Sequence, residues 1–578
     1  MSLPFKYDEP FVLLDFEGRR QLYRRPSRIV EVRDPAEIVP SLEWLRGQTA
    51  AGFIGYECAY AFEPKLLHLA RSPDPEEPPL LWFGIFDDGP ELAPDLPDGA
   101  GAWASAPQPL IAERDYTERL RTLEEHLLDG DIYQANFTFP AKAQFSGHPL
   151  ALYGQLRSRA RAPWSAVVFT GEHWIVSCSP ELFFTLKDGQ VTTRPMKGTA
   201  APDSDPEALR GDPKQRAENL MIVDLLRNDI SKIAVPGTVE VPRLLEVEHY
   251  PTVLQMTSTI VAELEPSLGP VDVLKAMFPC GSVTGVPKIS AMEIIHREEA
   301  HPRGVYTGSI GVMDATGGAA FNVAIRTLTI RAGSDRATLG LGSGVVADSV
   351  ADDEWQECLQ KGRFIPSIAA FDLIETMRIE DGLLRDLPLH LDRLGRSASQ
   401  FGFLFDRSRI QRSLHEHAAA AGSGRLRVTL AHGGELAMQF EPVNDLPGNV
   451  RVALVPLPVD RHDFRLRHKT TDRAFYDQAR EQSGCTEVIF VDPDGFLTEG
   501  SFTNIFVERD GRLITPPLVR GLLPGILRRK LIESGDAVEG DLVPRDLANG
   551  FFIGNSLRGL IAARLDQAVS RRKLAISS

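Results

Sequence analysis

The 578-residue sequence predicts a multidomain protein that mixes helices and strands, in α+β and α/β arrangements. The length indicates several domains, because one domain usually holds about 100–200 residues. Strand-like and helix-like stretches alternate along the chain, and this pattern restarts at about residues 365–371. We therefore expect three regions, residues 1–111, 112–365 and 366–578.

The composition is that of an ordinary globular protein, with 43% hydrophobic and 25% charged residues. The formal charge is −16, from 63 Lys and Arg against 79 Asp and Glu. A net negative charge repels nucleic-acid phosphates and anionic membranes, so neither nucleic acid nor a membrane is expected as a partner. Any anionic ligand must be held by a local basic site.

The cysteines and the first residues favour a cytoplasmic protein. The five cysteines are far apart, odd in number and form no CxxC pair, which disfavours a disulfide framework or a structural zinc site. The first residues include acids and no basic stretch before an apolar one, so no signal peptide is expected. No apolar run is long enough to cross a bilayer.

The first two regions are predicted to be rich in strands. Residues 89–109 are rich in Pro, Gly and Ala, which predicts a surface loop. Helices are expected at 116–131, at 352–363, and at 213–232, where an apolar helix should be largely buried. The predicted strands are 133–145, 164–170, 173–179, 181–186, 190–195 and several within 304–346.

The third region opens with a predicted strand, a turn at Asp381-Gly382, a second strand and a helix, all within residues 371–394. A further run of α/β character continues to about residue 568. We find no short-period repeat.

Acidic residues in the second region have spacings that suit metal binding. Glu354, Glu357 and Lys361 share one face of the helix at 352–363. Glu218 opens the apolar helix, and carboxylates from two helices can meet to hold a hard cation. The alternative is a solvated helix face with a Glu357–Lys361 ion pair.

Lys197 lies beside a Gly-Thr turn in the segment RPMKGT. Its amine can act as a nucleophile if burial or a cationic neighbour partly deprotonates it. The alternative is an ordinary surface lysine in a turn, and the residues alone leave both open.

Eight segments follow one another in an order that resembles the chorismate-utilising enzymes. This family includes component I of anthranilate synthase and of aminodeoxychorismate synthase, and the isochorismate and salicylate synthases. The match covers about 112–364, and residues 1–111 resemble the family's variable N-terminal part. It implies a β-sandwich with flanking helices, like that of anthranilate synthase component I. The segments are SCSPELFF (177–184), RPMKGTA (194–200), ENLMIVDLLRNDI (218–230), GSVTGVPK (281–288), RGVYTGSIG (303–311), NVAIRTL (322–328), GSGVVADS (342–349) and EWQECLQK (354–361).

The resemblance also implies a Mg²⁺ site and a chorismate site. Glu218 and Glu357 would coordinate Mg²⁺, with Glu354 close to it, and Mg²⁺ would clamp the ring carboxylate and help the C4 hydroxyl leave. Glu181 would be the general acid for that hydroxyl, which needs a carboxyl of raised pKa in a partly dry site. The groups implied to hold the substrate are Gly198, Thr199, Thr284, Tyr306, Arg326, Gly342, Gly344 and Lys361.

Lys197 distinguishes between members of this family. Aminodeoxychorismate synthases resemble this sequence in carrying lysine there, whereas anthranilate synthases usually carry a small residue. By resemblance, Lys197 attacks C2 of chorismate, so that ammonia enters at C4. Gln255 is a departure, because many relatives carry histidine there, although its amide can still form hydrogen bonds. No stretch resembles a glutamine amidotransferase, so ammonia is expected from a separate glutaminase subunit.

The third region holds a sparser set of polar residues. Lys469 lies just before a predicted helix, and Arg393 lies on the first one. Glu499 and Asn504 lie at a turn that enters a strand. Gly525 precedes another helix, whose free N–H groups and dipole favour a phosphate. Taken singly, each of these is more often an ordinary surface, turn or helix-start residue.

Their order resembles the fold-type IV enzymes that use pyridoxal 5'-phosphate, over about 371–565. These are the branched-chain and D-amino-acid aminotransferases and the aminodeoxychorismate lyases, and the resemblance implies a domain of two α/β subdomains. Lys469 would be the Schiff-base lysine and Glu499 the partner of the pyridine nitrogen. Leu527 departs from the threonine common in aminotransferases, which affects a side-chain contact only. The implied phosphate-binding groups are Arg393, the backbone at Ile526 and Leu527, and Ser556.

The two resemblances together imply a bifunctional enzyme that makes 4-aminobenzoate for folate biosynthesis. Chorismate would be aminated to 4-amino-4-deoxychorismate, which would then lose pyruvate. The motifs of the third region do not separate a lyase from a transaminase, and the fusion favours the lyase. The alternative is anthranilate synthase component I fused to a class IV aminotransferase, and Lys197 argues against it. By analogy, a homodimer through the third region is expected.

Overall fold

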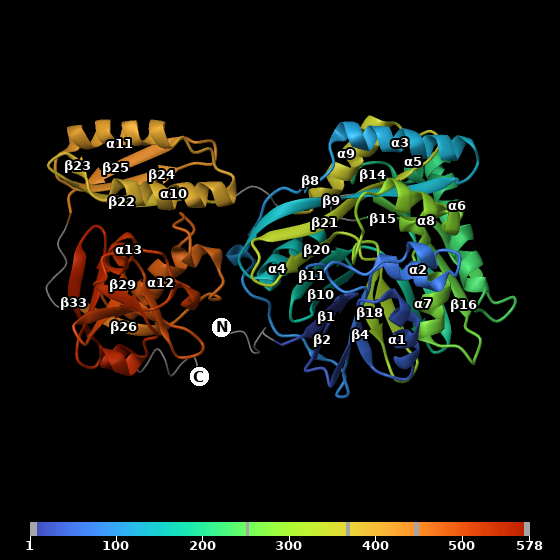
Figure 1. The fold of residues 1–578 in the computed structure, drawn as a ribbon, viewed down its shortest axis with the longest axis horizontal. Helices are drawn as coiled ribbons and strands as arrows, with labels where there is room; N and C mark the ends of the chain where they lie inside the picture. Colours follow the sequence, from blue (N-terminus) through green and yellow to red (C-terminus); the bar gives the residue numbers. More distant parts are fainter. Residues whose placement is uncertain (1–8, 250–253, 366–369, 444–449, 571–578) are drawn as a thin grey trace.

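The computed structural model describes residues 9–249, 254–365, 370–443 and 450–570. The front half, residues 9–365, and the back half, residues 370–570, form two lobes that stand side by side (Figure 1). The predicted boundary at residue 366 falls on residues 366–369, which lie outside the described residues. The prediction about a signal peptide concerns the first residues, of which 1–8 also lie outside the described residues.

An 11-stranded antiparallel sheet forms one layer of the front half, in the order β17-β9-β21-β20-β11-β10-β1-β2-β6, with β7 and β8 also pairing with β9. β10 and β11 are buried along their whole length, as their Val, Ile and aromatic residues predict. The strands are β1 (Phe11–Phe16), β2 (Arg19–Arg24), β6 (Glu91–Leu92), β7 (Trp103–Ala104), β8 (Gln108–Pro109), β9 (Gln134–Ser146), β10 (Trp164–Phe169), β11 (His173–Ser179), β17 (Gly285–Val286), β20 (Thr327–Arg331) and β21 (Arg336–Val345).

A 10-stranded sheet forms the other layer, in the order β14-β16-β13-β12-β19-β18-β4-β5-β3, with β15 also pairing with β16. The predicted strands at 181–186 and 190–195 correspond to β12 and β13. The strands are β3 (Arg28–Val32), β4 (Ala50–Ile54), β5 (Leu81–Ile85), β12 (Leu182–Lys187), β13 (Gln190–Arg194), β14 (Met196–Ala200), β15 (Glu240–His249), β16 (Leu254–Glu263), β18 (Ser309–Met313) and β19 (Ala319–Asn322).

The two sheets pack face to face around a shared hydrophobic core. Leu14 of β1 and Ile175 of β11 come from the first sheet, and Phe53 of β4 and Ile310 of β18 come from the second. Non-directional burial of these side chains holds the layers together. Residues 9–111 supply strands to both sheets, so this segment is part of the sandwich.

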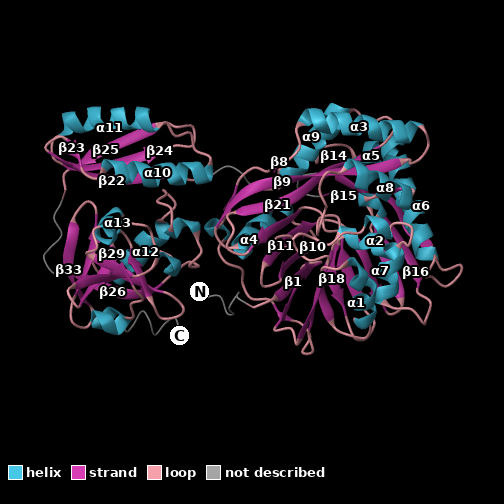
Figure 2. Ribbon diagram, in the orientation of Figure 1, coloured by secondary structure: helices cyan, strands magenta, loops and turns pink. Residues whose placement is uncertain are grey.

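Helices flank the sandwich (Figure 2). The predicted helices at 116–131, 213–232 and 352–363 correspond to α3, α6 and α9. The expectation that α6 is largely buried was wrong, because only one of its faces packs inward and Leu220 is 39% exposed. The helices are α1 (Ile38–Trp44), α2 (Ala59–Phe62), α3 (Glu113–Leu128), α4 (Pro149–Ala160), α5 (Pro206–Gly211), α6 (Pro213–Ser231), α7 (Pro270–Met277), α8 (Lys288–Glu298) and α9 (Ala351–Gly362).

The back half contains two sheets. A four-stranded sheet has the order β23-β22-β24-β25, and an eight-stranded mixed sheet has the order β28-β27-β26-β33-β32-β29-β30-β31. The strands are β22 (Leu373–Glu380), β23 (Leu383–Leu384), β24 (Gly424–Leu430), β25 (Leu436–Glu441), β26 (Val450–Pro456), β27 (Glu487–Val491), β28 (Leu497–Gly500), β29 (Asn504–Arg509), β30 (Arg512–Thr515), β31 (Ala537–Glu539), β32 (Phe551–Asn555) and β33 (Gly559–Leu565).

Two helices of the back half, α10 and α11, bury one apolar face each. In α10, Leu387, Leu391, Leu394, Ala398 and Phe401 recur at helical spacing and are buried. A glycine with positive φ, Gly402, ends this helix in the left-handed conformation that favours glycine. The helices are α10 (Leu387–Phe401), α11 (Arg407–Ala421), α12 (Ala474–Ser483) and α13 (Ile526–Glu533).

The segment predicted as a surface loop, residues 89–109, is only partly at the surface. β7 lies within it and pairs with the end of β9, with Trp103 opposite Ser146. Trp103 is 5% exposed and belongs to the hydrophobic core of the back half, together with Leu391 and Phe401. The prediction failed because the surface that covers Trp103 is formed by residues far along the chain, which local composition cannot reveal.

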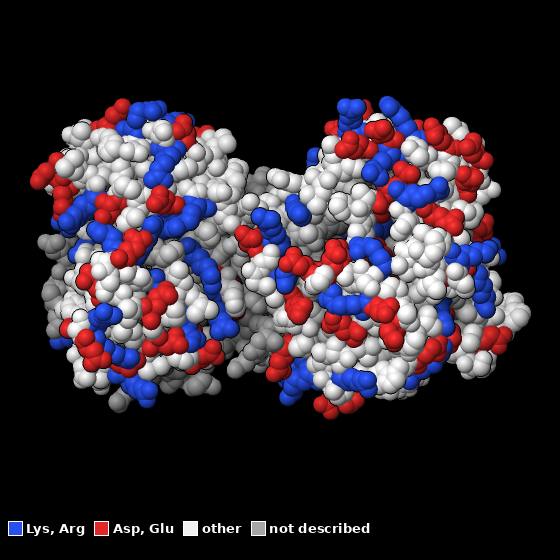
Figure 3. Space-filling view, viewed as in Figure 1, with Lys and Arg blue, Asp and Glu red and all other residues white. Residues whose placement is uncertain are grey.

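Acidic and basic side chains are interspersed over the visible face of both lobes (Figure 3). Within the described ranges, no helix is both long and apolar enough to span a membrane.

A buried ion pair generates a prediction about the stability of the front half. The Arg303 guanidinium lies 2.6 Å from the Glu299 carboxylate, with the two side chains 2% and 5% exposed. We expect Arg303→Met to destabilise the front half by about 3–5 kcal/mol, because it leaves a buried carboxylate unpaired. Urea unfolding of the full chain measures this.

The matched control is Arg331→Met, which removes an ion pair with Glu76 from a side chain that is 53% exposed. Its expected cost is below about 1 kcal/mol. Equal losses in the two variants would contradict the assignment of Arg303 as a buried structural cation.

Candidate active sites

Lys197 lies where β14 of one sheet, β21 of the other sheet and helix α6 come together. It projects from β14, and its Nζ lies 3.4 Å from the Glu218 carboxylate of α6. A Cβ atom added at Gly344 of β21 would lie 2.6 Å from the same Nζ. Glycine at position 344 therefore leaves the room that the lysine amine occupies.

The backbone of Lys197 is held by neighbouring amides. Asn219 Nδ2 donates to the Lys197 carbonyl at 3.0 Å, and Gln255 Nε2 donates to the Gly198 carbonyl at 2.9 Å. Gly198 has φ of +103°, a conformation that favours glycine. Gln255, a departure from the family pattern, thus supports the strand that carries the lysine. The predicted Gly-Thr turn was wrong, because Gly198 and Thr199 lie within β14, where the register shifts between Met196 and Thr199.

Glu181 is a buried carboxyl close to this lysine. Ser282 Oγ donates to its Oε1 at 2.7 Å. Burial raises the pKa of Glu181 to about 7, although the Ser282 hydrogen bond and the charge of Lys197 act in the opposite direction. The site therefore has the raised pKa that a general acid needs near neutral pH.

The acidic helix α9 places Glu357 and Lys361 together, as the spacing predicts. Lys361 Nζ lies 2.8 Å from the Glu357 carboxylate and donates to the Gly342 carbonyl at 2.8 Å. Burial acts to raise the pKa of Glu357, but the charges of Lys361 and Lys197 outweigh it and lower the pKa. Lys197 is thus electrostatically coupled to Glu357 as well as to Glu218.

Glu354 differs from the other two acids. Its Oε1 accepts a hydrogen bond from Ser349 at 2.7 Å, and its Oε2 is buried without a partner. Across the described part of the chain, no group of three or more His, Cys, Asp or Glu side chains is arranged to hold a metal. Glu218 and Glu357 instead each contact a lysine ammonium.

The other residues implied to bind substrate lie in different surroundings. Tyr306 packs its ring directly on Gly340, two residues before Gly342. Arg326 has φ of +50°, a strained conformation for a non-glycine residue. Thr284 is buried and donates to the Cys280 carbonyl at 2.8 Å, whereas Thr199 is exposed.

Gln134 is a site residue that sequence reasoning missed. It is the first residue of β9 and is fully buried, and neither side-chain amide atom has a hydrogen-bond partner. Its Nε2 lies 3.0 Å from the position of a Cβ at Gly344, beside Lys197. Unpaired buried polar atoms are costly, so Gln134 is suited to bind a polar ligand. The only sequence signal was an amide in a strand of buried residues.

In the back half, Lys469 is half-buried as a residue, and its amine is enclosed by the protein. It follows a short 3₁₀ turn, Phe464–Leu466, and its carbonyl accepts from the Ile374 N–H of β22 at 2.9 Å. Burial lowers the pKa of Lys469 to about 7, with the charge of Arg393 adding to the effect and that of Glu375 opposing it. A neutral amine near pH 7 is what a nucleophilic lysine requires.

Glu499 of β28 is a buried carboxyl in the same half. The Tyr476 hydroxyl donates to its Oε1, and the Leu523 N–H donates to its Oε2 at 3.0 Å. Burial raises the pKa of Glu499 to about 7. A cation placed against this carboxylate would offset the cost of burying it, so the position fits a protonated pyridine nitrogen.

Arg393 is fixed in orientation by Glu375, which sequence reasoning did not single out. Its Nε and Nη2 donate to the two Glu375 oxygens at 2.8 and 2.7 Å, and its Nη1 donates to the Pro524 carbonyl at 3.2 Å. Burial acts to raise the pKa of Glu375, but Arg393 and His390 outweigh it and lower the pKa strongly. The pair brings Arg393 close to the start of α13.

The groups implied to bind a phosphate gather around the start of α13. Gly525 precedes α13, and the Asn504 side chain lies directly against it. Ile526 and Leu527 begin the helix, so their N–H groups lack helical partners. Gly554 of β32 faces the Leu527 side chain, and Ser556 follows that strand. The structure thus places Arg393, Asn504, Ile526, Leu527 and Ser556 around one region.

Comparison with known proteins matches both halves to families. The model of the chorismate binding enzymes matches residues 9–367, and that of amino-transferase class IV matches residues 372–565.

Three known proteins illustrate the similarity of the front half. Aminodeoxychorismate synthase component 1 of Klebsiella aerogenes is 37% identical over 354 residues, covering 56% of this chain and 77% of the relative. The same component from Salmonella typhimurium is 42% identical over 264 residues, covering 44% of this chain and 58% of the relative. The crystal structure of anthranilate synthase component I from Streptococcus pneumoniae is 27% identical, with a TM-score of 0.51, covering 63% of this chain and 92% of that structure.

The buried amine of Lys469 generates a prediction about stability and pH. Its pKa is about 7 in the folded chain and about 10.5 when exposed, so folding at or below pH 7 requires burial of an ammonium or loss of its proton. We expect Lys469→Met to stabilise the back half of the cofactor-free chain by roughly 3–5 kcal/mol at pH 6–7. The gain should shrink toward zero as the pH approaches 10.

Chemical denaturation at pH 6, 8 and 10 measures this effect. The control is Lys530→Met, whose side chain is 47% exposed and pairs with Asp386. A stability gain of Lys469→Met that stays the same at all three pH values would argue against a buried, titrating amine.

Proposed function

The chain belongs to the chorismate binding enzyme family, and we propose that it makes 4-aminobenzoate in two steps. The front half would aminate chorismate to 4-amino-4-deoxychorismate with release of water. The back half would split this intermediate into 4-aminobenzoate and pyruvate. The observation that carries the proposal is the amine of Lys197, which lies beside Glu218 and close to Glu181. The match of residues 372–565 to amino-transferase class IV supports the second step.

Glu218 and Glu357 are proposed as the ligands of Mg²⁺. Enzymes commonly hold Mg²⁺ through one or two carboxylates, with substrate and water completing the shell. Glu218 and Glu357 each contact a lysine in this structure. They therefore fit a site of two carboxylates that substrate and water complete, and not a site whose ligands all come from the protein. Mg²⁺ bound there would supply Lewis-acid polarisation of the substrate. Glu354, with one buried oxygen unpaired, is proposed to lie close by.

Lys197 is proposed to attack C2 of chorismate as the C4 hydroxyl leaves. The Lys197 ammonium, which is paired with Glu218, must first lose a proton to solvent, because only the neutral amine is a nucleophile. Glu181 gives its proton to the hydroxyl, which departs as water. Ammonia then adds at C4, and the Lys197 amine is released. Arg326, Tyr306, Lys361 and the backbone near Gly342 and Gly198 would hold the carboxylates.

The back half is proposed to bind pyridoxal phosphate, whose aldehyde and pyridine ring supply an electron sink when bound. Lys469 would bind the aldehyde, and Glu499 would face the pyridine nitrogen. The phosphate would lie at the start of α13 near Arg393 and Ser556. Once freed by the amine of the intermediate, Lys469 would remove the proton at C4. The enolpyruvyl group would leave C3 with its oxygen and become pyruvate, and the ring would become aromatic.

The source of ammonia is proposed to be a separate glutamine amidotransferase, since the relatives are named as component 1 of a synthase. A cytoplasmic location and a homodimer through the back half complete the proposal by analogy.

The main alternative is anthranilate synthesis joined to transamination. Anthranilate synthase component I structures share the fold of the front half. Lys197 weighs against this alternative, because attack at C2 directs ammonia to C4.

Product analysis tests the proposal directly. Purified chain with chorismate, Mg²⁺, ammonium and pyridoxal phosphate should yield 4-aminobenzoate and pyruvate in equal amounts. Lys197→Ala should lower the rate by at least about a hundredfold. Anthranilate as the aromatic product, resolved by liquid chromatography, would rule the proposal out.

The pKa of Glu181 generates a second test. The Ser282 hydroxyl stabilises the Glu181 carboxylate, so Ser282→Ala should raise the pKa of Glu181 above about 7. If Glu181 acts as the acid, the basic limb of the amination pH profile moves to higher pH by about 1 unit. Ser177→Ala, which removes a hydroxyl bonded to Thr327 instead, is the control. An unmoved limb would remove Glu181 from this role.

A further inference from the structure

The front half contacts the chain segment that carries Lys469. We call residues 98–104 the docking loop and residues 460–469 the lysine segment. Asp98 of the docking loop lies 2.8 Å from the Arg465 guanidinium, which is buried and also pairs with Asp463 and Asp472. The charges that fix Arg465 therefore come from both halves of the protein.

Gly101 brings the docking loop very close to this cluster. A Cβ atom at Gly101 would lie 2.6 Å from Asp463 Oδ2. Asp463 cannot easily move, because its carboxylate accepts from the Arg465 side chain and backbone. The contact thus requires glycine on one side and a fixed carboxylate on the other.

Trp103 extends the contact into the hydrophobic core of the back half. Its ring lies 5.1 Å from that of Phe401 in an edge-on arrangement, and both belong to the core cluster that contains Phe464. Phe464 lies in the lysine segment and packs against Phe401 and Phe371. A front-half side chain therefore completes the core on which the lysine segment rests.

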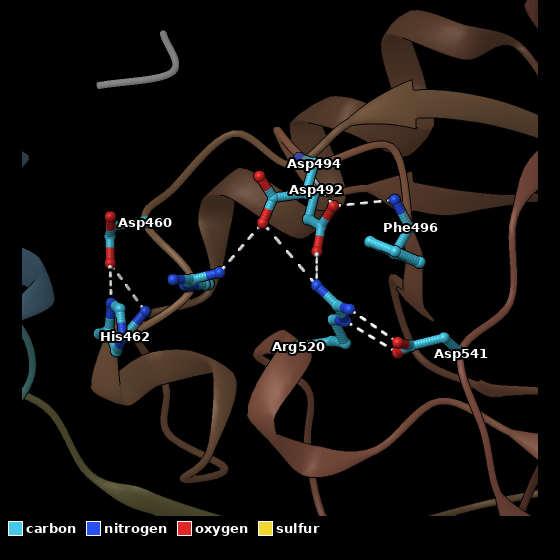
Figure 4. Close-up of polar contacts among 8 residues, drawn as sticks. Asp460, His462, Asp492, Asp494, Phe496, Arg520 and Asp541 are labelled. Carbon is cyan, nitrogen blue, oxygen red and sulfur yellow. Dashed lines mark hydrogen bonds and ion pairs between the residues drawn. The ribbon is translucent and has the colours of Figure 1, made fainter. Parts of the chain in front are cut away.

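The first residues of the lysine segment are contacted from both halves of the protein, and Figure 4 shows the side of the back half, with the Asp460–His462 contact and the acids around Arg520. His462 contacts Asp460 at 2.9 Å, and its ring lies 5.4 Å from that of buried His148 in the front half. On the other side, Arg461 pairs with Asp494 at 3.2 Å, within the network that Arg520 forms in the back half. At the far end, the His468 ring contacts Ser397 Oγ at 2.9 Å.

This interface and the front site lie at opposite ends of one strand. β9 begins at Gln134, beside Lys197, and ends at Ser146, opposite Trp103. A strand of this length spans about 40 Å. Near its end, the Phe145 carbonyl accepts from Gln400 Nε2 of the back half at 3.3 Å.

We propose that the docking loop is a positioning element of the back site, so that Lys469 is correctly placed only while Gly101 and Trp103 of the front half contact the lysine segment. The proposal rests on Lys469 being the reactive lysine of the proposed function. It goes beyond that function, because it makes the structure of the back site depend on a contact with the front half.

Hydrogen exchange in the full chain with bound pyridoxal phosphate tests the proposal. Gly101→Ala should speed exchange of the amides of residues 464–468 by about tenfold and weaken pyridoxal phosphate binding by a similar factor. Trp103→Ala should do the same, and Trp103→Phe should restore most of the protection. Consumption of chorismate with ammonium should stay unchanged, because neither residue belongs to the front site.

The matched control is Gly154→Ala in α4, where an added Cβ meets neighbours only at 3.6–3.8 Å. It should leave exchange and cofactor binding as in the wild type. Wild-type exchange in both Gly101→Ala and Trp103→Ala would overturn the proposal. So would a loss of front-half activity in parallel with the change, since the loop would then act on its own half. Amide exchange and pyridoxal phosphate binding are measured without forming product. A failed product assay would therefore count against the proposed function and not against the role of the docking loop.

Discussion

Removing an ionisable group from water disfavours its charged form, and both candidate sites are built on this penalty. Burial raises the pKa of Glu181 and Glu499 to about 7 and lowers that of Lys469 to about 7. Because burial acts on all of these groups, the neighbouring charges and hydrogen bonds determine in which direction each pKa finally moves. Glu375 shows the opposite outcome, because Arg393 and His390 outweigh its burial and keep it charged. Glu375 therefore differs from Glu181 and Glu499 in its charged partners, not in its burial.

The fold supplies this dry environment through close backbone approach. Gly344 leaves space for the Lys197 amine, and Gly101 leaves space for the Asp463 carboxylate. In each case a side chain at the glycine would crowd the charged end of that side chain. At both positions the backbone comes nearer to a charged side chain than a residue with a side chain would allow.

Local patterns in the sequence predicted much of this arrangement. The helix at 352–363 placed Glu357 and Lys361 on one face, and they form the ion pair at 2.8 Å that was one of the two alternatives for this spacing. The metal-binding alternative stays a prediction. Residues 89–109 were misread, because the surface that buries Trp103 comes from the back half. Gln134 and Glu375 were missed for a related reason: each lies in a strand, and its neighbours in the site come from other elements, Gly344 of β21 for Gln134 and Arg393 of α10 for Glu375. Contacts between distant segments leave no periodic signal.

The central claim is that one chain holds two separate sites that act in sequence. Mixing two variants, each lacking one lysine, tests this most directly. Lys197→Ala and Lys469→Ala should each make no 4-aminobenzoate from chorismate and ammonium, while Lys469→Ala should accumulate an aminated, non-aromatic intermediate. The mixture should then form 4-aminobenzoate. A mixture that stays inactive although the intermediate accumulates, or a single variant with wild-type product formation, would contradict the account.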